Sequence, residues 1–150
     1  MNDANTPAGG KPAPHWILKT MTRVHIFLHR LSGGRAFNTL GGDEVCFVTM
    51  TGAKSGHSIT IPLMYVPYNE GVLLVASQTG RPHNPVWYNN LVKNPGIEVR
   101  HRRRRMQLHA RLAQPEEKTT LWPICDEHYA PFAEYRQRTP RDIPIFVCEP

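Results

Sequence analysis

The chain has 150 residues, the length of one ordinary domain, which argues against an enzyme built from two domains. Hydrophobic residues make up 40% of the chain and aromatic residues 9%, enough for a packed core and too many for a disordered chain. Eighteen Lys and Arg residues against twelve Asp and Glu give a formal net charge of +6, which favours an anionic partner such as a phosphate, nucleic acid or acidic lipid.

The N-terminal segment divides into a tail and a helix. Residues 1–13 are rich in Pro, Gly and polar residues, so we predict a flexible tail that lacks the apolar run of a signal peptide. From Pro14, apolar residues recur at steps of three and four until Gly33-Gly34, which predicts an amphipathic basic helix. Such a helix either packs on the core or lies on an anionic membrane surface. We expect a single folded domain over residues 14–150.

Runs of apolar and alternating residues predict six strands, which we place at residues 45–51, 57–66, 72–76, 96–102, 106–112 and 143–148. The unbroken apolar run at 72–76 is typical of a central strand. Because short turns connect most of these strands, and helices lie near the start, middle and end, we predict an α+β protein built on a small antiparallel barrel.

Proline residues mark the starts of the later helices. Asn84 is a good helix cap and Pro85 a good first residue of a helix that ends at Asn94. A second helix is predicted from Pro115, where two acidic residues follow, and a third from Pro131.

The loop at residues 51–56 is the first candidate for chemistry. Gly52 and Gly56 let the backbone approach a ligand, and Lys54 supplies a compact positive charge, so the loop can cradle a phosphate or carboxylate. It is not a Walker loop, since two strands flank it where that motif needs a helix. A plain hairpin turn accounts for the same residues.

Two further groups of residues can form ligand walls. Ser77 follows the most apolar predicted strand and Trp87 comes soon after it, which is typical of a planar-ligand pocket or, on periodicity alone, of ordinary core. Tyr129, Phe132 and Tyr135 recur every three residues and form either core packing or an aromatic lid over a flat substrate.

Signals for metal binding and redox chemistry of cysteine are weak. His25 and His29 stand four apart, but no glutamate lies between them and no third ligand is evident, so we predict no metal site. Three cysteines without a C-x-x-C pair indicate no disulfide framework and favour a reducing cytoplasm. No stretch approaches the length of a membrane span, which leaves peripheral membrane contact through the first helix as the open alternative.

A basic run extends from His101 to Arg105 at a predicted hairpin tip. It could contact nucleic-acid phosphates, but the chain has no helix-turn-helix, RNP, zinc-finger or KH signature, so a solvated surface is the simpler interpretation. We expect no nucleic-acid partner, and we keep a basic nucleic-acid or membrane-surface module as the non-enzyme alternative.

A set of motifs in a fixed order resembles a known family. The motifs are Thr51-Gly52-x-Lys54-Ser55-Gly56, Ile61-Pro62-Leu63, Val75-Ala76-Ser77, Asn84-Pro85-x-Trp87-Tyr88-x-Asn90-Leu91, Asn94-Pro95, Glu116-Glu117, Leu121-Trp122-Pro123 and Ile143-Pro144-x-Phe146-Val147-Cys148-Glu149-Pro150. Together they resemble the deazaflavin-dependent nitroreductase family, mycobacterial and related actinobacterial enzymes that use reduced coenzyme F420. The resemblance implies the split β-barrel fold, of the FMN-binding type, with flanking helices.

The same resemblance implies an activity. We expect an F420H2-dependent reductase that transfers a hydride to a planar conjugated acceptor: a quinone, an enone, an unsaturated lactone or a nitroaromatic compound. A split-barrel protein that binds FMN or haem is the alternative within the same fold.

The resemblance also implies roles for individual residues. Those expected to bind the cofactor are Ala53, Lys54, Ser55, Gly56, Ile59, Thr60, Ile61, Pro62, Leu63, Met64, Val75, Ala76, Ser77, Gln78, Val86, Trp87, Tyr88, Asn89 and Asn90. Those expected to face the substrate are Met64, Tyr129, Phe132 and Tyr135. The candidates for catalysis are Ser77, Tyr129 and Tyr135, and the proton comes from one of these residues or from water.

The chain departs from the family pattern at two basic positions. The family commonly has Arg where this chain has Ala53 and often a basic residue where it has Ile59. Lys54 must therefore carry more of the cofactor's anionic tail, and His57 and Arg81 are candidates to compensate. Because aromatic and hydroxyl side chains of the substrate site also differ, reduction of nitroimidazoles is not assumed.

Overall fold

The computed structural model describes residues 39–40 and 42–150. The predicted tail at 1–13, the predicted helix that begins at Pro14, and the histidine pair His25 and His29 lie outside the described residues.

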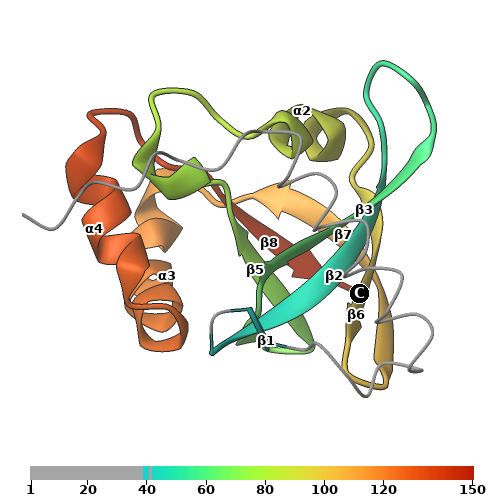
Figure 1. Cartoon of the computed structure of the whole chain (residues 1–150), viewed down its shortest axis with the longest axis horizontal. Helices are drawn as coiled ribbons and strands as arrows, with labels where there is room; N and C mark the ends of the chain where they lie inside the picture. Colours follow the sequence, from blue (N-terminus) through green and yellow to red (C-terminus); the bar gives the residue numbers. More distant parts are fainter. Residues whose placement is uncertain (1–38, 41) are drawn as a thin grey trace, which may run out of the picture.

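Antiparallel strands form the body of the molecule (Figure 1). In chain order they are β1 (Thr39–Leu40), β2 (Asp43–Thr51), β3 (Ser58–Met64), β4 (Val66–Tyr68), β5 (Gly71–Val75), β6 (Gly96–His101), β7 (Arg104–Leu112) and β8 (Ile145–Glu149). They pair in the order β1-β2-β6-β7-β8-β5-β4, and β3 pairs with β2 off this path. The predicted antiparallel sheet is confirmed.

The prediction of six strands is wrong, because the described residues form eight. The predicted strand at 57–66 is two strands with different partners: Met64 is the last residue of β3 opposite β2, and Val66 is already opposite Leu73 of β5. Tyr65 lies between them, where its backbone N–H donates to Glu44 O at 2.9 Å. A change of the strand with which a segment pairs does not alter the pattern of apolar residues in the sequence. Strand β1 has only two residues, too few to show the alternation typical of a strand.

The described helices are α2 (Val86–Lys93), α3 (Pro115–His128) and α4 (Pro131–Arg138), and a 3-10 turn, η1, spans Gln78–Gly80. All three helices are where the prolines predict them. The predicted cap is wrong: Pro85 is the N-cap of α2, and Asn84 Oδ1 instead accepts a hydrogen bond from Arg141 Nη1 at 2.6 Å.

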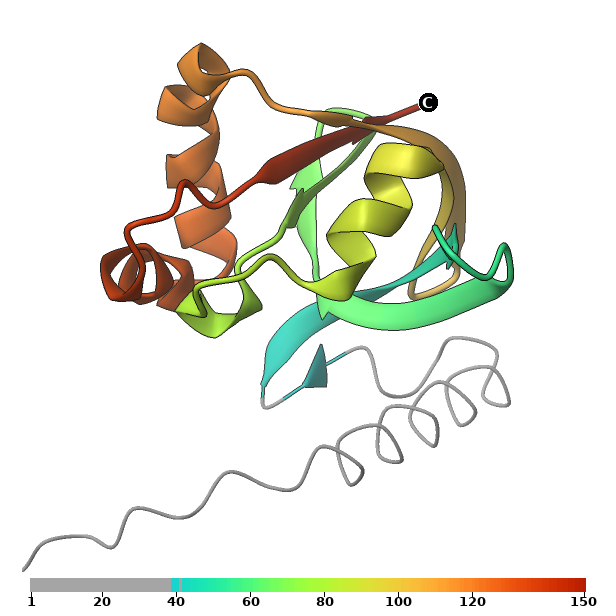
Figure 2. The same cartoon turned by 90° about the horizontal axis from the view of Figure 1, so that it is seen from above.

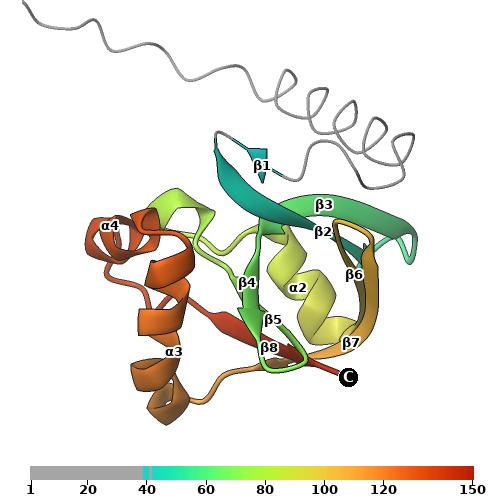
Figure 3. The ribbon, with the colours of Figure 1, turned by 90° about the horizontal axis from the view of Figure 1, so that it is seen from below.

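The strands curve around a core that α2 covers at one open end of the barrel, whereas α3 and α4 lie to one side (Figure 3). Leu74 and Phe146 point into the barrel and pack in one cluster with Trp87 of α2. Their neighbours Leu73 and Val147 pack in a second cluster with α3 and α4. Both faces of β5 and β8 are therefore buried, which explains their unbroken apolar runs.

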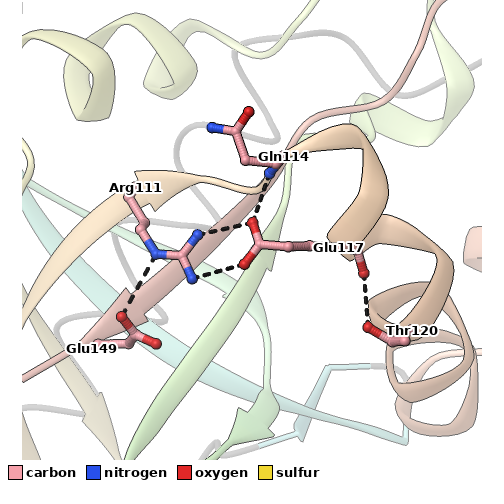
Figure 4. A network of polar contacts seen from close by, with 5 residues as sticks. All are labelled: Arg111, Gln114, Glu117, Thr120 and Glu149. Atoms are coloured by element: carbon pink, nitrogen blue, oxygen red, sulfur yellow. Dashed lines mark hydrogen bonds and ion pairs between the residues drawn. The ribbon is translucent and has the colours of Figure 1, made fainter.

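A polar network fixes the start of α3 against β7 (Figure 4). Both terminal nitrogens of Arg111 donate to the Glu117 carboxylate at 2.9 Å, which also accepts the N–H of Gln114 at 2.7 Å. Arg111 Nε lies 3.6 Å from a carboxylate oxygen of Glu149 on β8. The hydrogen bonds from Arg111, and then the one from Gln114, lower the pKa of Glu117.

This network predicts a pH-dependent contribution to stability. Because the pKa of Glu117 is lower in the folded state, its contribution is complete above the ordinary pKa of 4.5 and is lost as the pH falls through the lowered value. Arg111→Ala should therefore lower the melting temperature at pH 7, and wild type and variant should converge in strongly acidic solution. A constant difference at all pH values, measured by circular dichroism, would rule out the ion pair as the cause.

Candidate functional site

A pocket of about 200 Å³ lies where β3, β5, η1, α2 and α4 meet. Viewed from above, η1 lies beside α4 and leads into α2, which begins next to β3 (Figure 2). The pocket is lined by Pro62, Leu63, Met64, Val75, Ser77, Gln78, Thr79, Pro85, Trp87, Tyr129, Phe132 and Tyr135. Segments far apart in the chain thus converge on one hollow.

Most of these lining residues are among those expected from the sequence. All the residues expected to face the substrate, Met64, Tyr129, Phe132 and Tyr135, line the pocket together with Ser77. Thr79 and Pro85 also line it and were not expected, although both lie in the connection that joins Gln78 to Trp87. Pro85 also belongs to the motif Asn84-Pro85-x-Trp87-Tyr88, and Thr79 directly follows Gln78, so both lie beside sequence signals that could have found them.

The other expected residues lie outside this pocket. Some belong to the barrel core or pack against it: Ala76, Ile59, Ile61 and Tyr88. Others lie on the surface or beside the β2–β3 loop: Ala53, Lys54, Ser55, Gly56, Thr60, Val86, Asn89 and Asn90. Val86 is 83% exposed. The residues expected from the sequence to bind the cofactor are therefore divided in the fold among the pocket, the barrel core and the surface around the β2–β3 loop.

Three aromatic residues from the end of α3 and from α4 form one wall of the pocket. The hydroxyl groups of Tyr129 and Tyr135 are 3.0 Å apart, and Phe132 packs edge-on against both rings. Burial, followed by the hydrogen bond with Tyr135, raises the pKa of Tyr129 to about 12. Tyr129 therefore keeps its proton throughout the physiological range, and one hydroxyl of the pair can donate to a ligand while the other donates within the pair.

Ser77 lies in another wall of the pocket, at the end of β5. It is 8% exposed, and its hydroxyl makes no hydrogen bond within the described part of the chain. The next two residues, Gln78 and Thr79, have positive φ values of 45° and 56°, a backbone conformation that residues other than glycine rarely adopt. This wall therefore holds an unusual backbone conformation directly at the pocket.

In the β2–β3 loop, residues 52–57, most backbone amides already donate hydrogen bonds within the protein. The N–H of Gly52 donates to His57 O at 2.9 Å, and that of Gly56 donates to Gly52 O at 3.0 Å. The N–H of His57 donates to Ser55 Oγ at 3.2 Å, and that of Ala53 donates to Asn90 Oδ1 at 2.8 Å. An anion at this loop would therefore meet exposed side chains and few free backbone amides.

Helix α2 connects the loop to the pocket. Trp87 lines the pocket, and Asn90, one turn later on the same face and 6% exposed, holds the loop through Ala53. Lys93 at the end of α2 donates from Nζ to Ala53 O at 2.8 Å. Eight helical residues span about 12 Å, so the loop and pocket lie within reach of one elongated ligand.

The positive charge near the loop comes from both sides of it. Lys54 and His57 are exposed on the loop itself, and Lys93 reaches it from α2. Arg81 follows η1 at the other end of the site and is exposed. Lys93 was missed by sequence reasoning, because its approach to Ala53 depends on how α2 packs.

The basic run at the β6–β7 turn is partly neutralised. Arg102 pairs with Glu44, Arg105 with Glu98, and Arg104 donates to the Glu70 carbonyl oxygen at 3.4 Å. The Arg102–Glu44 pair lies at the end of β2 opposite the loop, whereas Glu98 lies opposite Thr49, nearer the loop.

Cysteine, metal and membrane features add little to the site. All three cysteines are free and buried, and burial raises the pKa of Cys46 and of Cys125 to about 12, which makes them poor nucleophiles. Within residues 39–40 and 42–150, no group of His, Cys, Asp and Glu side chains could hold a metal ion. No helix in the same part of the chain has the length and apolar character needed to cross a membrane.

Comparison with solved structures shows the fold to be that of F420-dependent reductases. An F420-H2 dependent reductase, FDR-A, superimposes with a TM-score of 0.65 at 39% identity, covering 70% of this chain and 93% of that one. A domain-swapped dimer aligns with a TM-score of 0.68 at 34% identity, and the alignment covers 89% of this chain and 97% of that one. The haem storage protein HutZ of Vibrio cholerae, at 13% identity and a TM-score of 0.54, shares the fold alone.

Comparison with characterised sequences gives the same family. An F420H(2)-dependent quinone reductase of Mycobacterium tuberculosis is 33% identical over 131 residues, covering 85% of this chain and 88% of that protein. The family model described as F420H(2)-dependent quinone reductase matches residues 21–150. The chain therefore belongs to the F420H2-dependent quinone reductase family and is an oxidoreductase whose cofactor is reduced coenzyme F420.

Proposed function

We propose that the pocket is the place where a hydride passes from reduced F420 to a planar conjugated acceptor, with quinones as the first class to test. The observation that carries this proposal is that Ser77, whose hydroxyl makes no hydrogen bond within the described residues, and the hydrogen-bonded pair Tyr129 and Tyr135 line one small pocket. Apolar side chains of Met64, Val75 and Trp87 complete walls suited to flat rings.

The size of the pocket limits what it can hold. At about 200 Å³ it is smaller than the roughly 300–1,000 Å³ of pockets that enclose whole drug-sized ligands. The residues present therefore fit a ring system in the pocket and an anionic tail along α2 toward Lys54. When bound, reduced F420 supplies the hydride.

The protein's own residues then exclude water, orient the acceptor and supply a proton. Phe132, only 3% exposed, closes the aromatic wall against solvent. An acceptor that has gained a hydride must also gain a proton, and Tyr129 and Tyr135 hold one at the pocket. Ser77 offers a second hydroxyl to a carbonyl oxygen of the acceptor.

The loop provides the test of where the anionic tail of the cofactor binds. Lys54→Ala should weaken F420 binding about tenfold, a loss of about 1.4 kcal/mol that reflects one charge-assisted contact reduced by exposure to solvent. The measurement is quenching of F420 fluorescence during titration with protein. Arg103→Ala is the matched control, because it removes one exposed positive charge at the opposite turn of the barrel.

The same titration separates the FMN alternative, which the comparisons do not support. F420 should bind and FMN should not. Tight FMN binding without F420 binding would overturn the proposed function, and equal affinity of wild type and Lys54→Ala for F420 would reject the lysine as the anchor. Which acceptor is used then follows from a screen of quinones, enones, unsaturated lactones and nitroaromatic compounds with reduced F420.

A further inference from the structure

Arg141 ties together the wall of the pocket that runs from β5 to α2. It lies in the connection between α4 and β8, far from that wall in sequence. Its Nε donates to Arg81 O at 2.8 Å and its Nη1 to Asn84 Oδ1 at 2.6 Å. Its Nη2 donates to Ser77 O at 2.8 Å and to Ala76 O at 3.1 Å. One guanidinium group thus bridges the start, middle and end of residues 76–84.

All of these acceptors are neutral. Within the described part of the chain Arg141 forms no ion pair, and partial burial lowers its pKa. An arginine retained without a carboxylate is a weak source of stability, since desolvation of its charge is not offset by an opposite charge. What it contributes here is geometry, because the planar fork directs its donors along fixed directions.

The segment that Arg141 bridges needs such support. Gln78, Thr79 and Gly80 all have positive φ, and only the last is a glycine. With its amide nitrogen facing the available acceptors, Gln78 donates to Asn84 O at 2.9 Å, which closes the segment on itself. Backbone conformations of this kind persist where the surroundings over-determine them.

We propose that Arg141 is a positioning residue, whose guanidinium holds residues 76–84 in the conformation that presents Ser77, Gln78 and Thr79 to the pocket. Its effect on turnover rests on the proposed function, but its effect on the segment does not. A lysine cannot replace it, because a single ammonium group cannot reach acceptors in three parts of the segment at once.

The test is hydrogen exchange followed by mass spectrometry on the full-length protein and its variants. The amides of Gly80 and Arg81 report directly, because they donate to Ser77 O and Gln78 O. Arg141→Lys and Arg141→Ala should exchange at least tenfold faster at residues 77–84, with no change in the strands. Asn84→Ala, which removes only one of the four bonds, should show a smaller increase and covers the case in which Arg141→Ala fails to fold. Arg111→Lys, which disturbs a different arginine network, is the matched control.

Kinetics provide a second readout. With reduced F420 and menadione, Arg141→Lys should raise the KM for the acceptor at least tenfold while kcat changes less, and millimolar guanidinium should partly restore Arg141→Ala. Wild-type exchange at residues 77–84 in Arg141→Lys, or an equal increase across the whole barrel, would overturn the proposal. If wild type does not oxidise reduced F420, the proposed function fails, and the exchange result alone decides the role of Arg141.

Discussion

Replacing Tyr129 and Tyr135 together by phenylalanine is expected to lower kcat with reduced F420 and a quinone by about 100-fold, the lower end of what a positioned proton donor contributes. Because the two hydroxyls are 3.0 Å apart, either can take the place of the other, so each single variant should lose less than the double variant. Steady-state kinetics at saturating F420 measure the effect. Tyr68→Phe is the control, since this tyrosine packs in the second cluster and does not line the pocket.

The raised pKa of Tyr129 makes the pH profile part of the same prediction. A tyrosine donates a proton only below its pKa, so a value of about 12 keeps the donor active well above pH 10. We expect kcat to show no alkaline decline near the ordinary tyrosine pKa of 10.0. A decline in kcat with a midpoint near pH 10 would mean that the Tyr129 hydroxyl is neither buried nor hydrogen-bonded to Tyr135. The tyrosine pair would then lose its assigned role as proton donor.

Gly80→Ala should have the largest effect on stability among the residues of the site. A Cβ at this position would meet Tyr135 O at 2.7 Å and Arg138 Cβ at 2.9 Å, and the φ of +75° is unfavourable for alanine. Strain and overpacking together are expected to lower the free energy of unfolding by about 2–5 kcal/mol. Because α4 must move to accommodate the methyl group, the pocket wall at Tyr135 should be disturbed as well.

Urea denaturation of Gly80→Ala beside Gly96→Ala measures this difference. Gly96 is exposed, has no atom within 4 Å of a Cβ, and does not need a positive φ. Its replacement should change stability by less than about 1 kcal/mol. Equal stability of the two variants would show that η1 and α4 are not packed together as described.

The central strands can be predicted from the sequence because their pattern of apolar residues matches the faces that the fold buries. Strands β5 and β8 are apolar on both faces, and the structure buries both. Prolines mark the starts of α3 and α4 correctly, since a residue without an N–H is tolerated at the first turn of a helix. The break at Tyr65 could not be predicted, because it is a change of pairing partner and not a change of local pattern.

The site is predictable to the extent that its residues lie in local motifs. Ser77, Trp87 and the aromatic triplet fall in segments that resemble the family, and the fold brings them to one pocket. Arg141 and Lys93 belong to no such pattern, and each contributes through contacts with residues 40 or more positions away in the chain. Tertiary contacts of this kind have no periodic signal, so they become visible only in the folded structure.

The most direct test of the proposed site is the rate at which menadione oxidises reduced F420 in the presence of wild type and of the double variant at Tyr129 and Tyr135. Wild type should oxidise one reduced F420 for each menadione reduced, and the double variant should bind F420 normally yet turn over about 100-fold more slowly. Wild-type turnover by the double variant would contradict the assignment of this tyrosine pair as the proton donor.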